Sequence, residues 1–506
     1  MSIILLIGFF CQLVFLMFVL ALDVLPIKYA AAVIGALLLI DIIAVLLLNS
    51  KKKLSAKPIL GLIMVVLVAN VLFVGDYYLY NTYDTLQKIS KHKARWEMYD
   101  VIALNGGKYQ TENDFDGETI NTIAMQSKQL NEAKETLVTK AGVEYNEEPN
   151  LLSVGHHIMD ENGETHDELI LVTNSEYKVL RGAIEGFGEN TNVIYKIKVK
   201  KRVNDSANRI DVTEESFNVL ISGNDVWGSI DQEALSDVNM IMTVNPKTRE
   251  ILLTSIPRDS YIPLHTYGQR DKLTHSGIYG EEETKHTIED FLETQINYTL
   301  RVNFSMLVDI VNAIDGVDVY NDVDFISHPK HWHYKKGNLH LEGHRALWFA
   351  RERKAFLEGD MKRNENQQKV LTAIIDKVSS SKVILTRYPK ILNSVEDEMA
   401  TDLTAQDLKK LAKMQLKDMN GWKISRVNIV GGTGMAPCYS MGNQNLSCVF
   451  PSEESVEEAK KKIHDVMYPV ENNKKKNVPQ DEQKDSEGKD KSTDSTKADN
   501  GSEGEK

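Results

Sequence analysis

Carboxylates follow or precede strand-like segments in the region 217–379, and they could bind a metal ion. Asp225 comes just after the segment 217–222, and Asp237 comes just before the segment 238–244. We expect both side chains to project from strand ends toward one edge of a sheet. Two carboxylates with several arginines suit a divalent cation that holds a pyrophosphate, because oxygen ligands bind the metal and forked donors bind the remaining oxygens.

Side chains that could bind such an anion come later in the same region. Arg351 and Arg353 are two residues apart, so in an extended segment both guanidinium groups lie on one face. Arg363 and Gln367 are four apart and share one side of a predicted helix. The candidate set also contains Arg258 and Asp259 after the third strand and Asp360 one turn before Arg363. The alternative is that these charges form solvated surface ion pairs, which contribute little.

The elements that would position these groups alternate between strand and helix patterns. The predicted strands are 217–222, 238–244, 251–256, 298–302 and 317–320. The predicted helices are 285–295, 304–314 and 360–378, and Thr404 with Asp407 forms a capping box that opens another helix. Asn245 and Pro246 are typical of a hairpin turn between the second and third strands. This pattern indicates an α/β or α+β domain with a central sheet.

Three apolar stretches, 3–22, 29–48 and 59–75, precede this domain. A helix of roughly 20 residues crosses a hydrocarbon layer of about 30 Å, so we predict three membrane spans. A cleaved signal peptide is the alternative for the first stretch, but no positive segment precedes it and no small-residue cleavage site follows it. Lysines crowd the connection 51–57, which predicts a cytoplasmic N-terminus and an extracellular location for everything after the third span.

Composition divides the rest of the 506 residues. The chain has 59 basic and 72 acidic side chains, a net charge of −13, which excludes a generally basic nucleic-acid coat, and we predict no nucleic-acid partner. We predict four parts: transmembrane helices in 1–75, an accessory domain in 76–214, the catalytic domain with a C-terminal extension in 215–470, and a disordered polar tail in 471–506.

Cys438 and Cys448 are the two cysteines outside the predicted spans. In an oxidising compartment such a pair predicts a disulfide, and two free thiols are the alternative. No CxxC or Cys/His spacing points to structural zinc. A run of histidines over 328–344 lacks matching carboxylates and predicts a surface loop. The glycines of 431–434 predict a turn, because no Lys-Ser/Thr follows them as in a phosphate loop.

Seven segments, with Arg363 and Gln367 after them, together resemble the LytR-CpsA-Psr family. They are Leu-Ile-Ser-Gly-Asn-Asp (220–225), Leu-Ser-Asp-Val-Asn-Met-Ile-Met-Thr-Val-Asn-Pro (235–246), Ser-Ile-Pro-Arg-Asp-Ser-Tyr (255–261), Lys-Leu-Thr-His-Ser-Gly-Ile-Tyr-Gly (272–280), Arg-Val-Asn-Phe (301–304), Asp-Gly-Val-Asp-Val (315–319) and Ala-Arg-Glu-Arg-Lys (350–354). The chain most resembles the streptococcal-type capsule CpsA branch, which also has three spans and an accessory domain.

The resemblance implies an α/β (α+β) catalytic domain with a central mixed sheet flanked by helices. It implies a membrane-anchored extracellular phosphotransferase of the Gram-positive cell envelope, which moves a capsular or teichoic-acid-like glycopolymer from undecaprenyl pyrophosphate to peptidoglycan. Polyprenyl pyrophosphatase activity is a second expectation. The implied partners are the lipid-linked glycopolymer, peptidoglycan, membrane lipid and the capsule assembly machinery. The alternative is a non-catalytic polyprenyl-lipid-binding scaffold or regulator of capsule assembly.

The resemblance also assigns roles to the candidate residues. Asp225 and Asp237 look like ligands of Mg²⁺, with Mn²⁺ as the alternative ion. Arg258, Arg351 and Arg353 look like the pyrophosphate clamp, with Asp360, Arg363 and Gln367 at the pocket mouth and Lys272 at a basic family position. The sequence departs at Leu235, where many relatives have arginine, and Arg270 could replace that contact.

The implied chemistry is attack by a sugar hydroxyl on one phosphorus while Mg²⁺ and the arginines neutralise charge on the leaving lipid phosphate. Asp259 is the candidate general base, and its alternative role is that of an arginine partner. The lipid tail requires an apolar tunnel. The helix after Asp360 could line that tunnel, although core packing also explains its apolar stripe.

Overall fold

The computed structural model describes residues 2–469 except 24, 50–55, 91–94, 126, 202–207, 224–236, 358, 380–386, 388–389, 392–393, 395–398 and 419. All of the described residues belong to one compact unit. The metal candidate Asp225, the position Leu235 and the predicted tail 471–506 lie outside the described residues.

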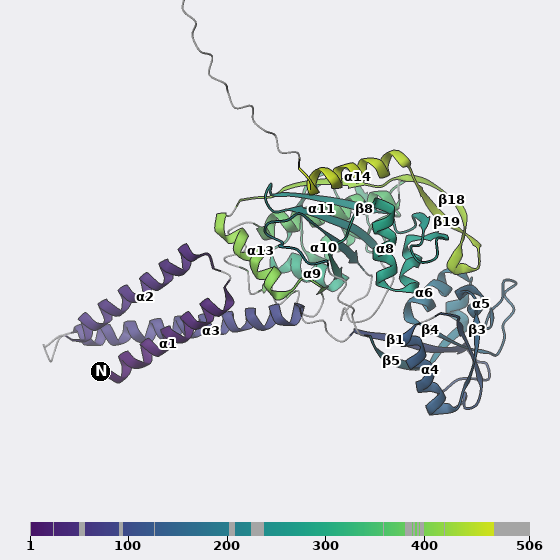
Figure 1. Ribbon diagram of the computed structural model, residues 1–506, viewed down its shortest axis with the longest axis horizontal. Coiled ribbons are helices and arrows are strands. Elements are labelled where there is room, and N and C mark those ends of the chain that lie inside the picture. The colour runs from purple at the N-terminus through teal and green to yellow at the C-terminus, as the bar shows by residue number, and fades with distance from the viewer. Residues whose placement is uncertain are drawn as a thin grey trace, which may run out of the picture. The chain divides into compact units, whose positions relative to one another are not determined.

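Three helices precede the sheets: α1 (Ser2–Leu22), α2 (Ile27–Leu48) and α3 (Ala56–Ser90) (Figure 1). Among the described residues, two segments are long and apolar enough to cross a membrane, Ile27–Leu48 and Ala56–Thr85. In α1 the described apolar part, Leu6–Leu22, is shorter. Two of the three predicted spans therefore have the length and composition of a membrane helix, and over its described residues the first does not.

Residues 95–201 form a five-stranded sheet in the order β3-β2-β4-β1-β5. Its strands are β1 (Arg95–Leu104), β2 (Thr119–Ile123), β3 (Glu144–Glu148), β4 (Leu169–Thr173) and β5 (Thr191–Lys201). Its helices are α4 (Lys128–Ala141), α5 (Leu151–His156), α6 (Asn174–Ala183) and α7 (Phe187–Asn190). The helix α6 begins at a capping box, in which Thr173 accepts from the amide of Glu176 and the Glu176 carboxylate accepts from the amide of Thr173.

A mixed six-stranded sheet carries the candidate chemistry, in the order β16-β11-β6-β7-β8-β17. Its strands are β6 (Phe217–Gly223), β7 (Val238–Asn245), β8 (Glu250–Ile256), β11 (Tyr298–Val302), β16 (Met399–Thr401) and β17 (Lys423–Asn428). The predicted central strands and the hairpin between β7 and β8 are confirmed. Asn245 closes that hairpin, because its side-chain oxygen accepts from the amides of Lys247 and Thr248 at 3.0 Å each.

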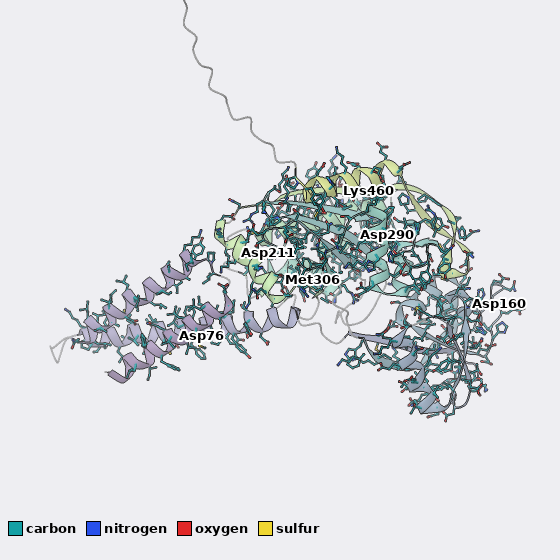
Figure 2. The ribbon with its side chains drawn as sticks, in the orientation of Figure 1. Asp76, Asp160, Asp211, Asp290, Met306 and Lys460 are labelled. Atoms are coloured by element: carbon teal, nitrogen blue, oxygen red, sulfur yellow. The ribbon has the colours of Figure 1, made fainter. Side chains whose placement is uncertain are left out.

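Helices cover both faces of this sheet, because alternate side chains of each strand point to opposite sides. Leu220, Ile241 and Leu252 pack with α8 (Glu281–Leu292) and α14 (Glu453–Met467). Val219, Met240 and Leu253 pack on the other face, toward α11 (Asp360–Ser379) and α13 (Ala405–Asp418). On α14, Lys460 (Figure 2) pairs with Glu293 at the end of α8, at 2.6 Å. The predicted capping box of α13 is confirmed, since Thr404 and Asp407 bond reciprocally.

A further helical layer packs against α11. It contains α9 (Phe304–Ala313), α10 (Gly343–Arg351) and the small strand pairs β12 (Val317–Asn321) with β15 (Gly337–Leu341) and β13 (Phe325–Ile326) with β14 (His333–Tyr334). The shared face of Arg351 and Arg353 was expected only for an extended segment, and that condition is not met, because Arg351 is the last residue of α10. The chain becomes extended only at buried Glu352, whose carboxylate accepts from the amides of His328 and Ala355.

A hairpin of β18 (Gly431–Cys438) and β19 (Gln444–Pro451) precedes α14, so the prediction of a turn at 431–434 is wrong. Glycine suits this strand because a Cβ on Gly431 would lie 1.8 Å from the backbone oxygen of Phe450. The turn comes later, at η2 (Tyr439–Met441) and Gly442, which has a φ of 58°. The hairpin packs Ala436, Cys438 and other residues into the core of the 95–201 region.

Candidate functional site

Asp237 and Arg258 meet at one edge of the six-stranded sheet. Strands β7 and β8 are antiparallel with Asn239 opposite Ile256, so the residue before β7 and the residues after β8 lie at the same end. Arg258 donates from Nη1 to Oδ1 of Asp237. The predicted convergence of a carboxylate and a guanidinium group at the sheet edge is therefore confirmed for this pair.

The first turn of α11 brings a second pair to the same edge. Arg363 donates from Nη2 to the backbone oxygen of Asp237 at 3.3 Å. The same Nη2 lies 2.7 Å from Oδ1 of Asp360. Helix α11 is held against the sheet by buried Gln368, which donates to the backbone oxygens of Leu253 and Val427. The sheet and the start of α11 thus jointly build the polar cluster.

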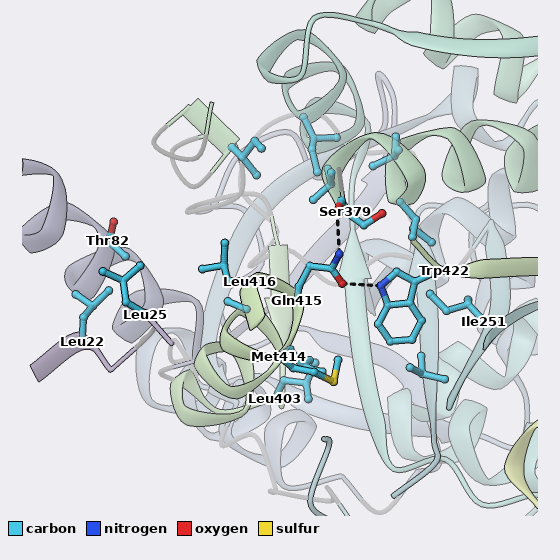
Figure 3. A pocket seen from close by; sticks show the side chains of 18 of the residues that line it. Leu22, Leu25, Thr82, Ile251, Ser379, Leu403, Met414, Gln415, Leu416 and Trp422 are labelled. Atoms are coloured by element: carbon cyan, nitrogen blue, oxygen red, sulfur yellow. Dashed lines mark hydrogen bonds between the residues drawn. The ribbon is translucent and has the colours of Figure 1, made fainter. Parts of the chain in front are cut away.

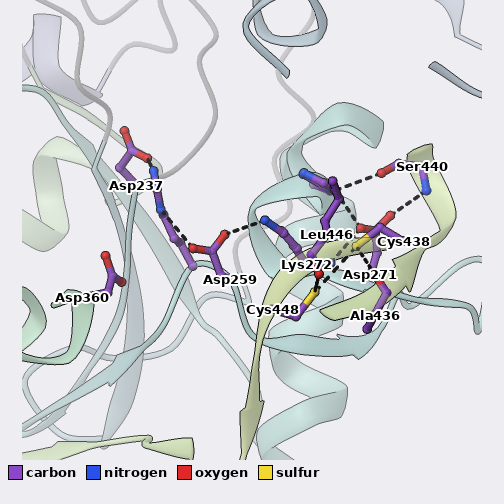
Figure 4. A network of polar contacts seen from close by, with 12 residues as sticks. Asp237, Asp259, Asp271, Lys272, Asp360, Ala436, Cys438, Ser440, Leu446 and Cys448 are labelled. Atoms are coloured by element: carbon purple, nitrogen blue, oxygen red, sulfur yellow. Dashed lines mark hydrogen bonds and ion pairs between the residues drawn. The ribbon is translucent and has the colours of Figure 1, made fainter. Parts of the chain in front are cut away.

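Asp259 extends the cluster to the short strand pair β9 (Tyr261–Pro263) and β10 (Arg270–Lys272). Its carboxylate lies 3.6 Å from Nε of Arg258 and 3.4 Å from Nζ of Lys272 (Figure 4). Asp237, Arg258, Asp259 and Lys272 therefore alternate in charge along the site. Both cationic neighbours favour the alternative that Asp259 is an arginine partner.

Burial perturbs the charged groups of this cluster. Burial raises the pKa of Asp360. The positive charges of neighbouring arginines, including Arg363 and Arg353, act in the opposite direction but do not cancel this effect. Burial also lowers the pKa of Arg363. For Arg258, burial opposes the charged form, but Asp237 and Asp259 raise the pKa above its usual value. Such perturbed groups at one sheet edge are typical of functional sites.

Several buried polar atoms of the cluster have no hydrogen-bond partner within the described structure. They are both carboxylate oxygens of Asp360, Nε of Arg258 and Nε of Arg363. Arg363 is close enough to Asp360 for an ion pair, but the pair is not aligned as a hydrogen bond. Unsatisfied buried polar atoms are rare and costly, so these four indicate capacity for a polar ligand.

Lys178 is a member of the cluster that the sequence did not indicate. Its Nζ lies 3.8 Å from Oδ2 of Asp237. It belongs to α6, in the 95–201 region, and nothing in its local sequence marks it as a site residue. Only the packing of two regions that are distant in the chain brings this cation to the carboxylate.

The structure also describes the remaining candidates, Arg351, Arg270, Gln367 and Arg353. The guanidinium carbon of Arg351 lies 4.0 Å from the ring centre of Phe304 and 4.9 Å from that of Trp348. Arg270, proposed to replace the missing family arginine, donates instead to the backbone oxygen of Tyr261 at 3.2 Å. Gln367 is half-buried on α11. Arg353 is exposed, but its charge acts on both Asp360 and Arg363.

An apolar cavity of about 770 Å³ adjoins the other end of α11 (Figure 3). Ile374, Ile375 and Val378 of α11 line it, as predicted for the helix after Asp360. The other walls come from the sheet, α13, α1 and α3, and include Val219, Met242, Leu411, Trp422, Phe15, Val19 and Leu79. Arg363 and Ile375 are twelve residues apart on one helix, about 18 Å at 1.5 Å per residue. One helix therefore connects a charged cluster to an apolar cavity.

The cysteines on the β18–β19 hairpin are free, so the predicted disulfide is absent and the alternative of two thiols describes this structure. The strand register pairs Cys438 with Gln444 and Cys448 with Gly434, so the two are not cross-strand neighbours. Their Sγ atoms are nevertheless 3.8 Å apart, because both side chains point to the same buried side.

Comparison with known proteins gives consistent matches. Residues 178–480 match the model of the LytR_cpsA_psr family. The chain is 37% identical over 195 residues to the polyisoprenyl-teichoic acid–peptidoglycan teichoic acid transferase TagU of Bacillus cereus strain AH820, covering 38% of this chain and 63% of that protein. It is 35% identical over 202 residues to the protein of the same name from Enterococcus faecalis strain V583, covering 39% of this chain and 65% of that protein.

Among solved structures, TagV of B. subtilis matches with a TM-score of 0.43 and 28% identity, over 50% of this chain and 98% of that chain. The chain spans 63% to 65% of the length of the two curated relatives named above.

Proposed function

Because the chain belongs to the LytR_cpsA_psr family, we propose that it is a membrane-anchored transferase that moves a glycopolymer from undecaprenyl pyrophosphate to peptidoglycan. The glycopolymer is a capsular polysaccharide or a teichoic-acid-like polymer. The observation that carries this proposal is helix α11, which places Asp360 and Arg363 in a buried charged cluster and Ile374 and Ile375 in an apolar cavity. A lipid pyrophosphate has a charged head and an apolar tail. The charged cluster at the start of the helix suits the head, and the cavity near its end suits the tail.

The charged cluster supports recognition of the head group. Arg258 and Arg363 each keep a buried Nε without a hydrogen-bond partner, so each has a donor available for a phosphate oxygen. A hydrogen bond to a charged group contributes about 1.5 to 3 kcal/mol. Exposed Arg353 and half-buried Lys272 add positive charge nearby. We propose that Arg351 also joins the phosphate clamp, as the family resemblance implies.

The same cluster suits a hard divalent cation. Asp237 and Asp360 present carboxylate oxygens, and both oxygens of Asp360 have no hydrogen-bond partner among the described residues. Mg²⁺ prefers oxygen ligands, so we propose Mg²⁺, with Mn²⁺ as the alternative, held by Asp237 with Asp225 and with Asp360 beside them. When bound, the cation supplies charge neutralisation for the phosphates. Arg258 and Arg363 orient the pyrophosphate against that charge.

The apolar cavity supports binding of the polyprenyl tail. Each buried methylene contributes about 0.8 kcal/mol, so about a dozen of them contribute about 10 kcal/mol. A cavity of about 770 Å³ walled by Ile374, Leu411 and Trp422 therefore offers most of the affinity for the lipid. Phe15 and Val19 of α1 line it as well, so the tail can enter from the membrane side.

In the transfer step, a sugar hydroxyl of peptidoglycan attacks the phosphorus that carries the glycopolymer, and the bond to the lipid phosphate breaks. The hydroxyl proton passes to a base, and we propose Asp259 for this role in addition to its ion pairs with Arg258 and Lys272. The ion pairs of Asp259 with Arg258 and Lys272 keep its carboxylate in place beside the pyrophosphate. Hydrolysis of polyprenyl pyrophosphate is the same step with water as the acceptor. Phosphoryl transfer depends mainly on positioning and charge stabilisation.

We also propose the location. The N-terminal helices would anchor the chain, as three spans if α1 crosses too, and the lysines of 51–57 support a cytoplasmic N-terminus. The sheets then lie outside the cell, where peptidoglycan is, and membrane lipid and the capsule assembly machinery are the remaining partners. The 95–201 region acts as an accessory domain that supplies Lys178 to the site.

A non-catalytic scaffold that binds polyprenyl lipid is the second candidate, because the apolar cavity by itself would suit it. Turnover separates the two. The full chain in detergent, with Mg²⁺, a polyprenyl-pyrophosphate-linked glycan and peptidoglycan, should transfer the glycan. Chelation should stop transfer, and added Mg²⁺ should restore it. Arg258→Ala should abolish transfer, while the matched control Arg426→Ala, an exposed arginine on β17, should not. Lipid binding with no turnover would instead support the scaffold.

A further inference from the structure

A buried group of potential metal ligands begins at Asp271, the residue before Lys272, and lies outside the charged cluster. Asp271, His275 and Cys438 each offer a ligand atom, and these atoms all lie within 4.8 Å of one another. All three side chains are buried, with 0%, 5% and 0% of the residue exposed. Among the described residues they form the only such group of three histidine, cysteine or acidic ligands. The three come from β10, η1 (Leu273–Tyr279) and the end of β18.

Cys448 lies beside this group, in contact with Cys438 but outside the set of atoms that are all within 4.8 Å of one another. Its Sγ lies 3.8 Å from Sγ of Cys438 (Figure 4). In a tetrahedral zinc site the metal–sulfur bonds are about 2.3 Å long, which separates two thiolate sulfurs by about 3.8 Å. The spacing of the two sulfurs is therefore the one that a shared zinc ion requires.

The hydrogen bonds around the group orient the carboxylate and the imidazole. Asp271 accepts from the amide of Ser440 at 2.7 Å, and one of its oxygens lies 2.7 Å from Nδ1 of His275. The thiols have weaker partners: Cys438 lies 3.7 Å from the backbone oxygen of Ala436, and Cys448 lies 3.4 Å from that of Leu446. Asp271, His275 and Cys438 thus form a close donor set, and the second thiol, Cys448, lies against Cys438.

We propose that Cys438, Cys448, His275 and Asp271 bind a divalent transition-metal ion of the zinc class. Thiolate and imidazole ligands select zinc over magnesium, so this site is chemically distinct from the proposed pyrophosphate site. As the two metal–sulfur bonds form, both thiols release their protons to solvent. Two thiolates and one carboxylate exceed the charge of the ion by one, and the adjacent ammonium group of Lys272 offsets that charge.

The site would crosslink the β18–β19 hairpin to β10 and η1. The hairpin also contacts the segment that carries the charged cluster, since the amide of Val449 donates to the backbone oxygen of Asp259 at 2.8 Å. A metal ion at this site would therefore hold the hairpin in place, and through the hairpin the backbone of Asp259, although the ion contacts neither Asp259 nor Lys272. This role does not depend on the proposed transferase activity, and its test measures metal and thiols.

The test uses the full chain in detergent, purified without a histidine tag. Elemental analysis should find about one zinc ion per chain, as expected for a closed four-ligand site. Cys438→Ser with Cys448→Ser should lose that zinc, and His275→Gln should lower its affinity. Cys11→Ser is the matched control, because Cys11 lies on α1 away from the group, and it should keep the zinc.

Cobalt substitution gives a readout that does not depend on variants folding. The wild-type chain loaded with Co²⁺ should show thiolate-to-cobalt charge transfer and the visible bands of tetrahedral cobalt. Thiol titration should find both hairpin thiols protected until a chelator is added. An intramolecular disulfide without zinc would overturn the proposal. Free thiols without zinc, or zinc that the double cysteine variant retains, for example on the histidines of 328–344, would overturn it too.

Discussion

Arg258, two residues after strand β8, donates a hydrogen bond from Nη1 to the carboxylate of Asp237, the residue before strand β7. This pair lies at the centre of the charged cluster. Arg363 reaches the backbone of the same aspartate, and Lys178 reaches its second carboxylate oxygen. A phosphate group or a metal ion that binds at this edge must therefore compete with the contacts that Asp237 already makes with these three cationic side chains.

Replacement of Arg258 by lysine should lower the transfer rate about 10² to 10³-fold, the loss typical when one preorganised donor to a transition-state charge is removed. Lysine keeps the charge but lacks the planar, fixed donors with which a guanidinium group can bind Asp237 and a phosphate oxygen together. The initial rate of glycan transfer measures the effect. A rate within threefold of wild type would show that charge alone matters at this position.

Asp360→Asn should stabilise the fold at neutral pH while it lowers activity. Burial raises the pKa of Asp360, so the folded state holds the proton more tightly than the unfolded state. The free energy of unfolding contributed by this group therefore falls as the pH rises from below the unfolded pKa of about 3.9 through the folded pKa. The gain of the variant should be present at pH 7 and disappear near pH 3.

Thermal unfolding of wild type and Asp360→Asn across that pH range measures the difference. Asp318→Asn is the matched control, since its carboxylate on β12 is exposed and pairs only with His340 among the described contacts. A variant less stable than wild type at pH 7 would mean that the ion pair with Arg363 outweighs the burial of the charge.

Ile375→Glu should weaken binding of polyprenyl pyrophosphate at least about tenfold. A carboxylate in the apolar cavity makes it less favourable for the lipid tail to leave water and enter the cavity. A loss of about 1.4 kcal/mol in binding free energy already corresponds to a factor of ten in affinity. Ile326→Glu is the control, because Ile326 is 51% exposed on β13, away from the cavity. Fluorescence titration with a labelled polyprenyl lipid measures the affinity. Thermal unfolding should first show that both variants are folded. If both then bind the lipid with equal affinity, the cavity is excluded as the lipid site.

Lys178→Ala should lower the transfer rate only modestly, by up to about fivefold. The ion pair with Asp237 spans 3.8 Å and the lysine side chain is 45% exposed, so solvent screens it to about 1 kcal/mol or less. Lys140→Ala, which removes an ion pair with Glu112 in the same region, should leave the rate unchanged. A loss above a hundredfold would make Lys178 a direct phosphate ligand.

The local elements could be predicted because their signals are local. The hairpin of β7 and β8 follows from Asn245 and alternating apolar residues, and the start of α13 follows from Thr404 and Asp407. The helical conformation of Arg351 could not be predicted, because Glu352, the residue that follows α10, contacts His328, which is distant in the chain. Spacing of two residues predicts a shared face only when the backbone is known to be extended.

The amino-acid sequence by itself determined the strands, the helices and the charged residues at their ends. Arg258 follows one strand, Asp237 precedes another, and Arg363 lies one turn into a helix. Each depends on neighbours within a few residues, where propensity and pattern act. Tertiary structure alone decided that Lys178 reaches Asp237, that Arg351 lies on aromatic rings, and that Cys438 lies close to His275 and Asp271 while both hairpin cysteines stay free. Those contacts join residues far apart in the chain, and only the packing of whole sheets and helices fixes their distances.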